Sequence, residues 1–435
     1  MTLDNKRKQS RLRALWTRIA VFLAIMGPGI ITGNVDNDAG GITTYSIVGA
    51  RYQYTMLWGL LLTTVALIVI QEMSTRMGIV TGKGLADLIR ERFGVRITFF
   101  AMAILLFANL ATTVSDFAGI AAGAELFGLS RYLVVPLLGL VIWWVIIRGS
   151  YHQVERILLI LSAVFLTYVV SGVLAKPDWG AVWRNVFVPT IHLPSGKLAF
   201  TDTGYLTIFI AMVGTTITPW MQFYQQAMVV DKGLTLKDLK YARIDTFVGS
   251  LMTDFFSLFM VVACGAVLFP RGILINDAAE AAAALGPLAG KYAAGLFAFG
   301  LLNASVMAAT VLPLSTAYAV SEAFGWESAV GRRWSEAPEF FTLFTVMIVI
   351  GVVAVLNPGL NLIKTMLFSQ TLNGILLPLI LIVMLILVND KKLMGHHTNS
   401  PLMNVIGWGQ AIMLIAMTVA LLGFTIAQSA GWMPA

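Results

Sequence analysis

Long apolar segments decide which class of fold this chain can adopt. A transmembrane helix needs about 20 mostly apolar residues. Of the 435 residues, 58% are hydrophobic and only 12% are charged, roughly half the charged fraction of a soluble domain. The sequence therefore predicts an all-α polytopic membrane protein, embedded in a lipid bilayer, with eleven transmembrane helices. We expect these spans at residues 18–50, 53–80, 97–127, 131–149, 153–175, 204–230, 243–269, 290–323, 338–356, 361–389 and 402–428.

The distribution of basic residues predicts the orientation. If the amino terminus is cytoplasmic, most of the 29 lysines and arginines fall on the cytoplasmic side, as the positive-inside rule requires. An odd number of spans then places the carboxyl terminus outside, and we expect a multi-pass protein of the cell membrane. Because the loops account for the net charge of +7, nucleic acid is not an expected partner. Nothing in the sequence specifies the oligomeric state, and a monomer is our working expectation.

Two of the expected spans contain residues that break helices. The first carries GPG and then GNVDNDAGG at 33–41, and the sixth carries Gly214 and Pro219. Proline removes a backbone donor and clashes with the preceding turn, and glycine weakens a helix. Because the two spans are five apart, they predict an inverted 5+5 repeat with a binding site near the middle of the membrane. We expect a basic tail at 1–17, a single transmembrane domain at 18–428, repeat one at 18–175, repeat two at 204–389 and an extra helix at 402–428.

Two aspartates lie in the first broken span. A charge in mid-membrane costs several kcal/mol and is usually tied to a partner or a pathway. The basic residue closest in sequence is Arg51, so Asp36 and Asp38 predict a cation site. If the chain is extended here, Asn34, Asp36 and Asp38 lie on one side; we favour unwinding at 38–41, where the glycines cluster. If the helix continues through Asp36, only one carboxylate reaches the ion; alternatively, either carboxylate hydrogen-bonds amides that the break frees.

The stretch GPGIITGNVDNDAGGITTYSIVGARYQYTMLW resembles the first span of the NRAMP family of divalent metal transporters. Members of that family carry an Asp-Pro-Gly-Asn motif, which falls here on residues 38–41. The segments QEMSTRMGIVTGKGLADLIRERFG, SDFAG, IRGSYHQVERILL, SQTLNGILLP and NDKKLMGHHTNSPLMN also resemble the family, in order between residues 20 and 428. The resemblance implies the inverted-repeat fold of the amino-acid and Na⁺-coupled transporters, with a metal site between broken spans one and six.

The resemblance also implies which positions form that site. Asp38 corresponds to the aspartate ligand and Thr215 to a backbone carbonyl ligand. Gln370, with Asn373 nearby, corresponds to a glutamine that can join the site. Two family ligands are replaced, because an asparagine corresponds to Gly41 and a methionine to Thr218. With the additional carboxylate, the candidate metal-site residues are Asp36, Asp38, Gly41, Thr215, Thr218 and Gln370.

These replacements predict a change in the metal that the site prefers. A thioether is a soft ligand that favours transition metals, whereas oxygen ligands suit Mg²⁺, Ca²⁺ and Mn²⁺. The smaller side chains also leave room for a partly hydrated Mg²⁺, which gives up its water reluctantly. The pattern resembles the NRAMP-related magnesium transporter branch, and Mn²⁺ is a second candidate. We expect the ion to be transported cargo and expect no resident cofactor.

Proton coupling is the second difference from the family. Members that couple metal to H⁺ carry histidines on span six, and the corresponding residues here are Trp220 and Gln225. The acidic pair on span three is reduced to Asp116, because its glutamate position is Gly119. All four histidines lie in or near loops. Since a proton relay near neutral pH is hard to build without histidine, we expect weak or no coupling.

Other functions are compared with this prediction. A proton-coupled Mn²⁺/Fe²⁺ importer of the same fold is the first alternative, although the missing methionine argues against it. An amino-acid/cation symporter is the second, but two aspartates would repel a substrate carboxylate at the broken helix. The sequence places no histidine–carboxylate or serine–base set in mid-membrane, so we do not expect an enzyme.

Overall fold

The computed structural model describes residues 27–149, 157, 160–190, 193, 198–276, 278–282, 293–328 and 330–429. The helices of its first part are α2 (Pro28–Asp36), α3 (Ala39–Tyr52), α4 (Leu57–Thr81), α5 (Leu85–Leu126), α6 (Arg131–Arg148), η1 (Ser162–Phe165), α8 (Leu166–Leu174), α9 (Trp179–Phe187) and η2 (Ala199–Thr201). The second part contains α10 (Thr203–Thr216), α11 (Pro219–Asp231), α12 (Leu239–Val267), η3 (Phe269–Arg271), α13 (Ala278–Ala282), α15 (Ala293–Phe324), α16 (Pro338–Val355), α17 (Leu362–Val388), α18 (Lys391–Met394) and α19 (Pro401–Ser429).

The prediction of an all-α membrane protein is confirmed. Within the described residues, nine helical segments are long and apolar enough to cross a membrane, including α10 and α11 taken together. The first expected span is divided into α2 and α3, which have 9 and 14 residues, and its start lies outside the described residues. The fifth, at 153–175, also lies partly outside them. The structure therefore agrees with the expected arrangement but does not test the count of eleven.

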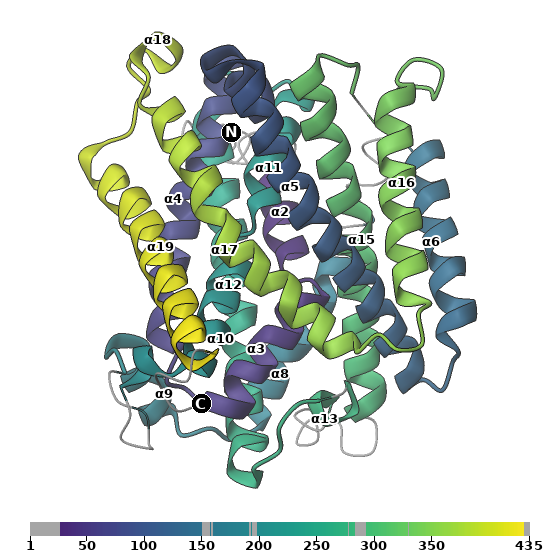
Figure 1. Cartoon of the computed structure of the whole chain (residues 1–435), viewed down its shortest axis with the longest axis vertical. Helices are drawn as coiled ribbons and strands as arrows, with labels where there is room; N and C mark the ends of the chain where they lie inside the picture. The colour runs from purple at the N-terminus through teal and green to yellow at the C-terminus, as the bar shows by residue number, and fades with distance from the viewer. Residues whose placement is uncertain are drawn as a thin grey trace, which may run out of the picture.

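The packing follows the expected inverted repeat. Each broken helix packs against the helix that follows the other one: α12 lies against α2 and α3, and α4 lies against α10 and α11. The third spans of the two halves, α5 and α15, pack side by side. The extra helix α19 runs along the edge of the bundle beside α17 and α4 (Figure 1). In the same view α18 lies at the upper end of the bundle and α19 ends in its lower part, but which end is cytoplasmic stays a prediction.

Glycines bring α2 into backbone contact with α12. A Cβ atom built on Gly249 would lie 2.2 Å from the carbonyl oxygen of Gly29, and one on Gly33 would lie 2.6 Å from that of Gly249. The Thr253 hydroxyl on α12 donates to the Gly33 carbonyl. Asn37, just after α2, donates through Nδ2 to the Thr253 carbonyl at 3.3 Å. These contacts anchor the end of α2 and so fix the position of the first break.

Arg76 on α4 fastens the segment before α19 to the bundle. Its side chain is 2% exposed. Its Nε donates to both carboxylate oxygens of Glu72 at 3.1 Å, its Nη1 donates to the His397 carbonyl, and its Nη2 donates to Asn399 Oδ1 at 2.5 Å. Glu72 also accepts from Arg243 Nε at 2.7 Å. Arg76 is therefore the shared centre of a network between α4 and the α18–α19 connection.

Replacing Arg76 with methionine should destabilise the protein. The substitution keeps an apolar stem but removes the bonds to residues 397 and 399, while Glu72 keeps Arg243. Hydrogen bonds that involve a charged group each contribute roughly 1.5–3 kcal/mol, so we expect a clear fall in the melting temperature of the purified protein. Arg243→Met is the control, because its exposed ion pair contributes little. Equal melting temperatures for the two variants would contradict the role of Arg76.

Candidate functional site

The first break is short and is set by a helix cap. Helix α2 ends at Asp36 and α3 begins at Ala39, so only Asn37 and Asp38 lie between them. The expectation of unwinding at 38–41 is wrong in its extent, because residues 39–41 already form the first turn of α3. Asp38 has extended backbone (φ −71°, ψ −176°), and its Oδ1 accepts from the Gly41 amide at 2.5 Å. This N-cap satisfies a free amide and lets the helix begin at once.

The second break has a different cause. Helix α10 ends at Thr216 and α11 begins with Pro219, leaving Ile217 and Thr218 between them. Proline fits the first position of a helix because its missing N–H is not needed there. In a continuous helix, however, the Thr215 carbonyl would accept from residue 219, and proline has no amide hydrogen to donate. The predicted break in the sixth span is thus confirmed, and it leaves the Thr215 carbonyl without its helical donor.

Oxygen atoms from both breaks converge beside Gly41. A Cβ atom built on Gly41 would lie 3.0 Å from Thr215 Oγ1, 3.1 Å from the Asp36 carbonyl oxygen and 3.3 Å from Asp38 Oδ1. Thr218 Oγ1 donates to Asp36 Oδ1 at 3.2 Å. Two buried atoms in this group, Asp36 Oδ2 and Thr215 Oγ1, have no hydrogen-bond partner. The structure therefore places Asp36, Asp38 and Thr215 around Gly41 and joins Thr218 to this group through the Asp36 carboxylate.

Gln370 reaches the same carboxylate from α17. Its Nε2 donates to Asp38 Oδ1 at 3.2 Å and to Asp38 Oδ2 at 3.0 Å. Its Oε1 accepts from Asn373 Nδ2 at 3.1 Å. The structure thus confirms that Gln370 is adjacent to Asp38 but turns the amide nitrogen, not the oxygen, toward it. Service as a metal ligand stays a prediction and requires the amide to turn.

The site is closed and strongly acidic. The side chains of Asp36, Asp38, Thr215, Thr218 and Gln370 are all at most 2% exposed. Two further buried carboxylates are close enough to interact electrostatically, Asp116 with Asp38 and Asp254 with Asp36. None of these four aspartates belongs to an ion pair found among the described side chains. Buried carboxylates without a cationic partner are costly, so the arrangement favours a bound cation.

Carboxylates and histidines alone cannot make a metal site in the part of the chain that the structure describes. No three histidine, cysteine, aspartate or glutamate side chains come close enough there to hold an ion. His396 and His397 lie on the connection before α19, while His152 and His192 fall outside the described residues. An ion beside Gly41 would need hydroxyl, backbone carbonyl or water oxygens to complete its shell. That composition suits a hard cation.

Two supporting contacts were not anticipated from the sequence. Ser257 Oγ on α12 donates to Asn37 Oδ1 at 3.0 Å, so the residue between the two aspartates is tied to α12. Tyr45 Oη lies 2.7 Å from Thr216 Oγ1, which joins α3 to the end of α10. The available signal was a polar residue inside an apolar span, but the sequence does not show which polar residues meet.

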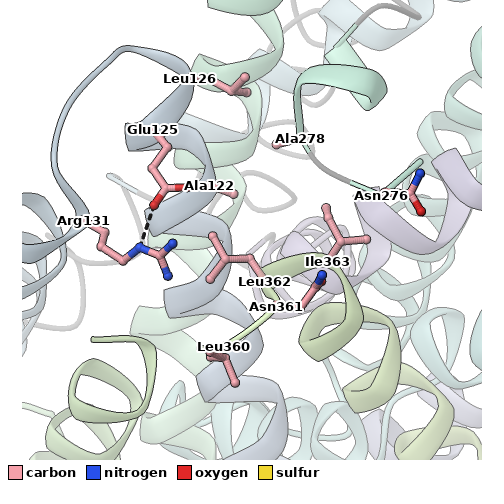
Figure 2. A pocket seen from close by; sticks show the side chains of 10 residues that line it. All are labelled: Ala122, Glu125, Leu126, Arg131, Asn276, Ala278, Leu360, Asn361, Leu362 and Ile363. Carbon is pink, nitrogen blue, oxygen red and sulfur yellow. Dashed lines mark hydrogen bonds and ion pairs between the residues drawn. The ribbon is translucent and has the colours of Figure 1, made fainter. Parts of the chain in front are cut away.

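Cavities large enough to hold water lie away from the candidate metal site. One of about 390 Å³ lies near the start of α17 and is lined by Asn276, Asn361 and the ion pair of Glu125 and Arg131, whose atoms are 2.6 Å apart (Figure 2). A second, of about 180 Å³, shares the two asparagines and extends to Arg51 at the end of α3. The candidate metal-site residues line neither cavity. The candidate site is therefore occluded, and a larger cavity of about 840 Å³, lined by Asp390 and Trp408 among others, also lies away from it.

Comparison with known proteins places this architecture among transporters. The family described as natural resistance-associated macrophage protein-like (Nramp) matches residues 29–423. The divalent metal cation transporter MntH of Bacillus subtilis (strain 168) is 24% identical over 435 residues, covering 97% of this chain and 98% of MntH. Relatives of this kind are named as transporters, which agrees with the expectation that the chain is not an enzyme.

Solved structures support the fold. The manganese transporter of Eremococcus coleocola, crystallised with an aromatic bis-isothiourea-substituted compound, matches with a TM-score of 0.75 at 21% identity. The match covers 95% of this chain and 89% of the transporter chain. Mhp1, a nucleobase-cation-symport-1 family transporter, has a TM-score of 0.59 at 15% identity and covers 93% of both chains. At these identities the likeness establishes a shared fold.

Proposed function

Since this chain belongs to the natural resistance-associated macrophage protein (Nramp) family, we propose that it is a secondary transporter that moves divalent metal cations across a membrane by alternating access. The observation that carries the proposal is the convergence beside Gly41. There, oxygen atoms of Asp36, Asp38 and Thr215 approach one point from two broken helices. Carboxylate, hydroxyl and carbonyl oxygens are the ligands that hard divalent cations take.

We further propose that Mg²⁺ is the preferred cargo and Mn²⁺ the alternative. The side chains that bond to Asp36 and Asp38 offer only the Thr218 hydroxyl and the Gln370 amide nitrogen, and no thioether takes part in these bonds. Gly41 also contributes no side chain, which leaves space for water on the ion. Since Mg²⁺ usually keeps several waters, this combination favours it. Manganese stays a serious candidate, because it also accepts oxygen ligands and because relatives are named for divalent metal and manganese transport.

Weak or absent proton coupling completes the proposal. Gln225 occupies one of the positions where the resemblance places histidine. Its Oε1 accepts from Thr32 Oγ1 at 2.9 Å, and its Nε2 donates to Thr75 Oγ1 at 2.9 Å. It therefore joins α11 to α2 and α4 by an amide, which does not titrate. Trp220 occupies the other position and likewise cannot carry a proton.

The direct test is uptake by proteoliposomes that contain the purified protein. External Mg²⁺ or Mn²⁺ is added, and the internal concentrations of metal and H⁺ are followed with separate dyes. Saturable uptake of either ion supports transport, and faster saturable uptake of Mg²⁺ supports the preferred cargo. Uptake no greater than in protein-free liposomes would contradict the proposed function.

Thr218→Met should change the selectivity of the site. The substitution replaces the hydroxyl that donates to Asp36 with a soft thioether at the break of the sixth span. We expect the ratio of apparent Mn²⁺ or Cd²⁺ affinity to Mg²⁺ affinity to rise about tenfold, equivalent to ~1.4 kcal/mol. Competition uptake assays measure this ratio. Thr310→Met provides the control, because Thr310 is a buried threonine of α15 whose hydroxyl bonds only its own helix; an unchanged ratio in Thr218→Met would count against the softness argument.

A further inference from the structure

The Gln370 amide is bonded to the Asp38 carboxylate that a cation at the candidate metal site would bind. Both of its hydrogen bonds to Asp38 come from Nε2, and its side chain is completely buried. The amide can reach this position because Gly40 has no side chain: a Cβ atom built there would lie 1.9 Å from Nε2. An amide N–H edge carries partial positive charge and satisfies the carboxylate that a cation would otherwise bind. Gln370 thus takes part of the place of the ion.

A directional chain of hydrogen bonds fixes this orientation. Thr112 Oγ1 on α5 donates to the Ala108 carbonyl at 3.0 Å, which uses its only proton. The same oxygen accepts from Asn373 Nδ2 at 3.0 Å, and Asn373 Nδ2 donates its second proton to Gln370 Oε1 at 3.1 Å. Turning the Gln370 amide alone would set two NH₂ groups against each other. Asn373 therefore donates both to Thr112 and to Gln370, and Gln370 in turn donates to Asp38.

We propose that Asn373 is a positioning residue that holds Gln370 as a hydrogen-bond donor to Asp38, so that Gln370 competes with the divalent cation instead of joining its ligands. This inference rests on the proposed function and concerns the regulation of the same site. The competing amide weakens binding of the ion and makes its release easier. A transporter gains from this, because an ion held too tightly leaves slowly.

Removing the positioning group should tighten binding of the ion. In Asn373→Leu nothing fixes Oε1, so the amide can turn its oxygen to the cation. Exchange of a competing hydrogen bond for a ligand corresponds to about a tenfold fall in Kd. We measure it by calorimetric titration of the purified protein with MgCl₂ and MnCl₂. In proteoliposomes, KM and kcat should fall together, a gain in binding that simple loss of packing does not produce.

Asn109→Leu is the matched control. Asn109 is a completely buried asparagine on α5 whose Nδ2 donates to a threonine hydroxyl, Thr316 Oγ1, at 2.8 Å and whose Oδ1 has no partner, as is true of Asn373 Oδ1. It has no bond to Gln370. We expect Asn109→Leu to leave the Kd unchanged. Equal values of Kd for Asn373→Leu and Asn109→Leu would overturn the positioning role.

A second variant separates competitor from ligand. Gln370→Leu removes the amide with little change in size. If Gln370 competes with the cation, the Kd of this variant for the cation should be equal to or lower than that of the wild type. A Kd raised tenfold or more would show that Gln370 is a ligand and would overturn the inference. These outcomes differ from failure of the proposed function, in which the wild-type protein itself binds no divalent cation.

Discussion

Replacing Asp38 with asparagine should abolish divalent-cation transport while the broken first helix stays intact. Asp38 is the one residue that both caps α3 and presents a carboxylate to the space beside Gly41. Asparagine is as good a cap as aspartate, so its side-chain oxygen can still accept from the Gly41 amide. The negative charge is lost, however. Removing one partner from a buried charge pair costs about 3–5 kcal/mol, which corresponds to a loss in affinity of roughly 100-fold to several thousand-fold.

The measurement is Mg²⁺ and Mn²⁺ uptake by proteoliposomes, together with the melting temperature of the purified variant. Asp202→Asn is the matched control, because Asp202 caps α10 in the same way, by accepting from the Tyr205 amide at 2.7 Å. Asp202 lies at the start of α10, at the end of that helix opposite the break. We expect uptake by the control to equal that of the wild type. Wild-type uptake by Asp38→Asn would remove Asp38 from the site.

The equilibrium ratio of internal to external metal concentration should depend on the membrane potential with two charges moved per ion. The ratio should not depend on the pH gradient. A potential of 100 mV acts on a divalent ion with about 4.6 kcal/mol, or roughly a 2,000-fold ratio of concentrations at equilibrium. One proton carried with each ion would add a third charge and make accumulation depend on pH. The two alternatives therefore differ by more than tenfold at the same potential.

Valinomycin and K⁺ gradients set the potential in proteoliposomes, and the reversal potential of metal flux gives the charge moved per ion. Imposed pH gradients are then varied at constant potential. We expect a slope of two charges and no shift with pH. Internal acidification that tracks metal uptake, or a slope of three charges, would contradict uncoupled transport and favour the proton-coupled alternative.

The elements of the fold were readable from local sequence. Nearly every span follows from an apolar segment, and even where α5 extends to 42 residues its kink at Gly94 (φ 77°) leaves a part close to the expected span at 97–127. The two breaks follow from Gly214, Pro219 and the glycine-rich stretch after Pro28. Helix propensity and hydrophobicity act over a few residues, so a single sequence contains their signals.

The details of the site were less readable, because they depend on contacts between distant segments. The break covers residues 37 and 38 instead of 38–41, since capping by Asp38 stabilises the helix that the glycines would weaken. The direction of the Gln370 amide depends on Thr112, which is 258 positions away in the chain and reaches it only through Asn373. Hydrogen-bond direction of this kind follows from the folded network and from no local pattern.

Pro219 has a consequence for how such a protein can change its cargo during evolution. The carbonyl that it leaves free at residue 215 belongs to the backbone, so no substitution at Thr215 removes it. Substitutions at 218 and 370 would change the side chains that bond to the two aspartates and would leave this backbone oxygen in place. On the proposed function, a change of preferred metal would then need only substitutions at these positions, with the two helix breaks left unchanged.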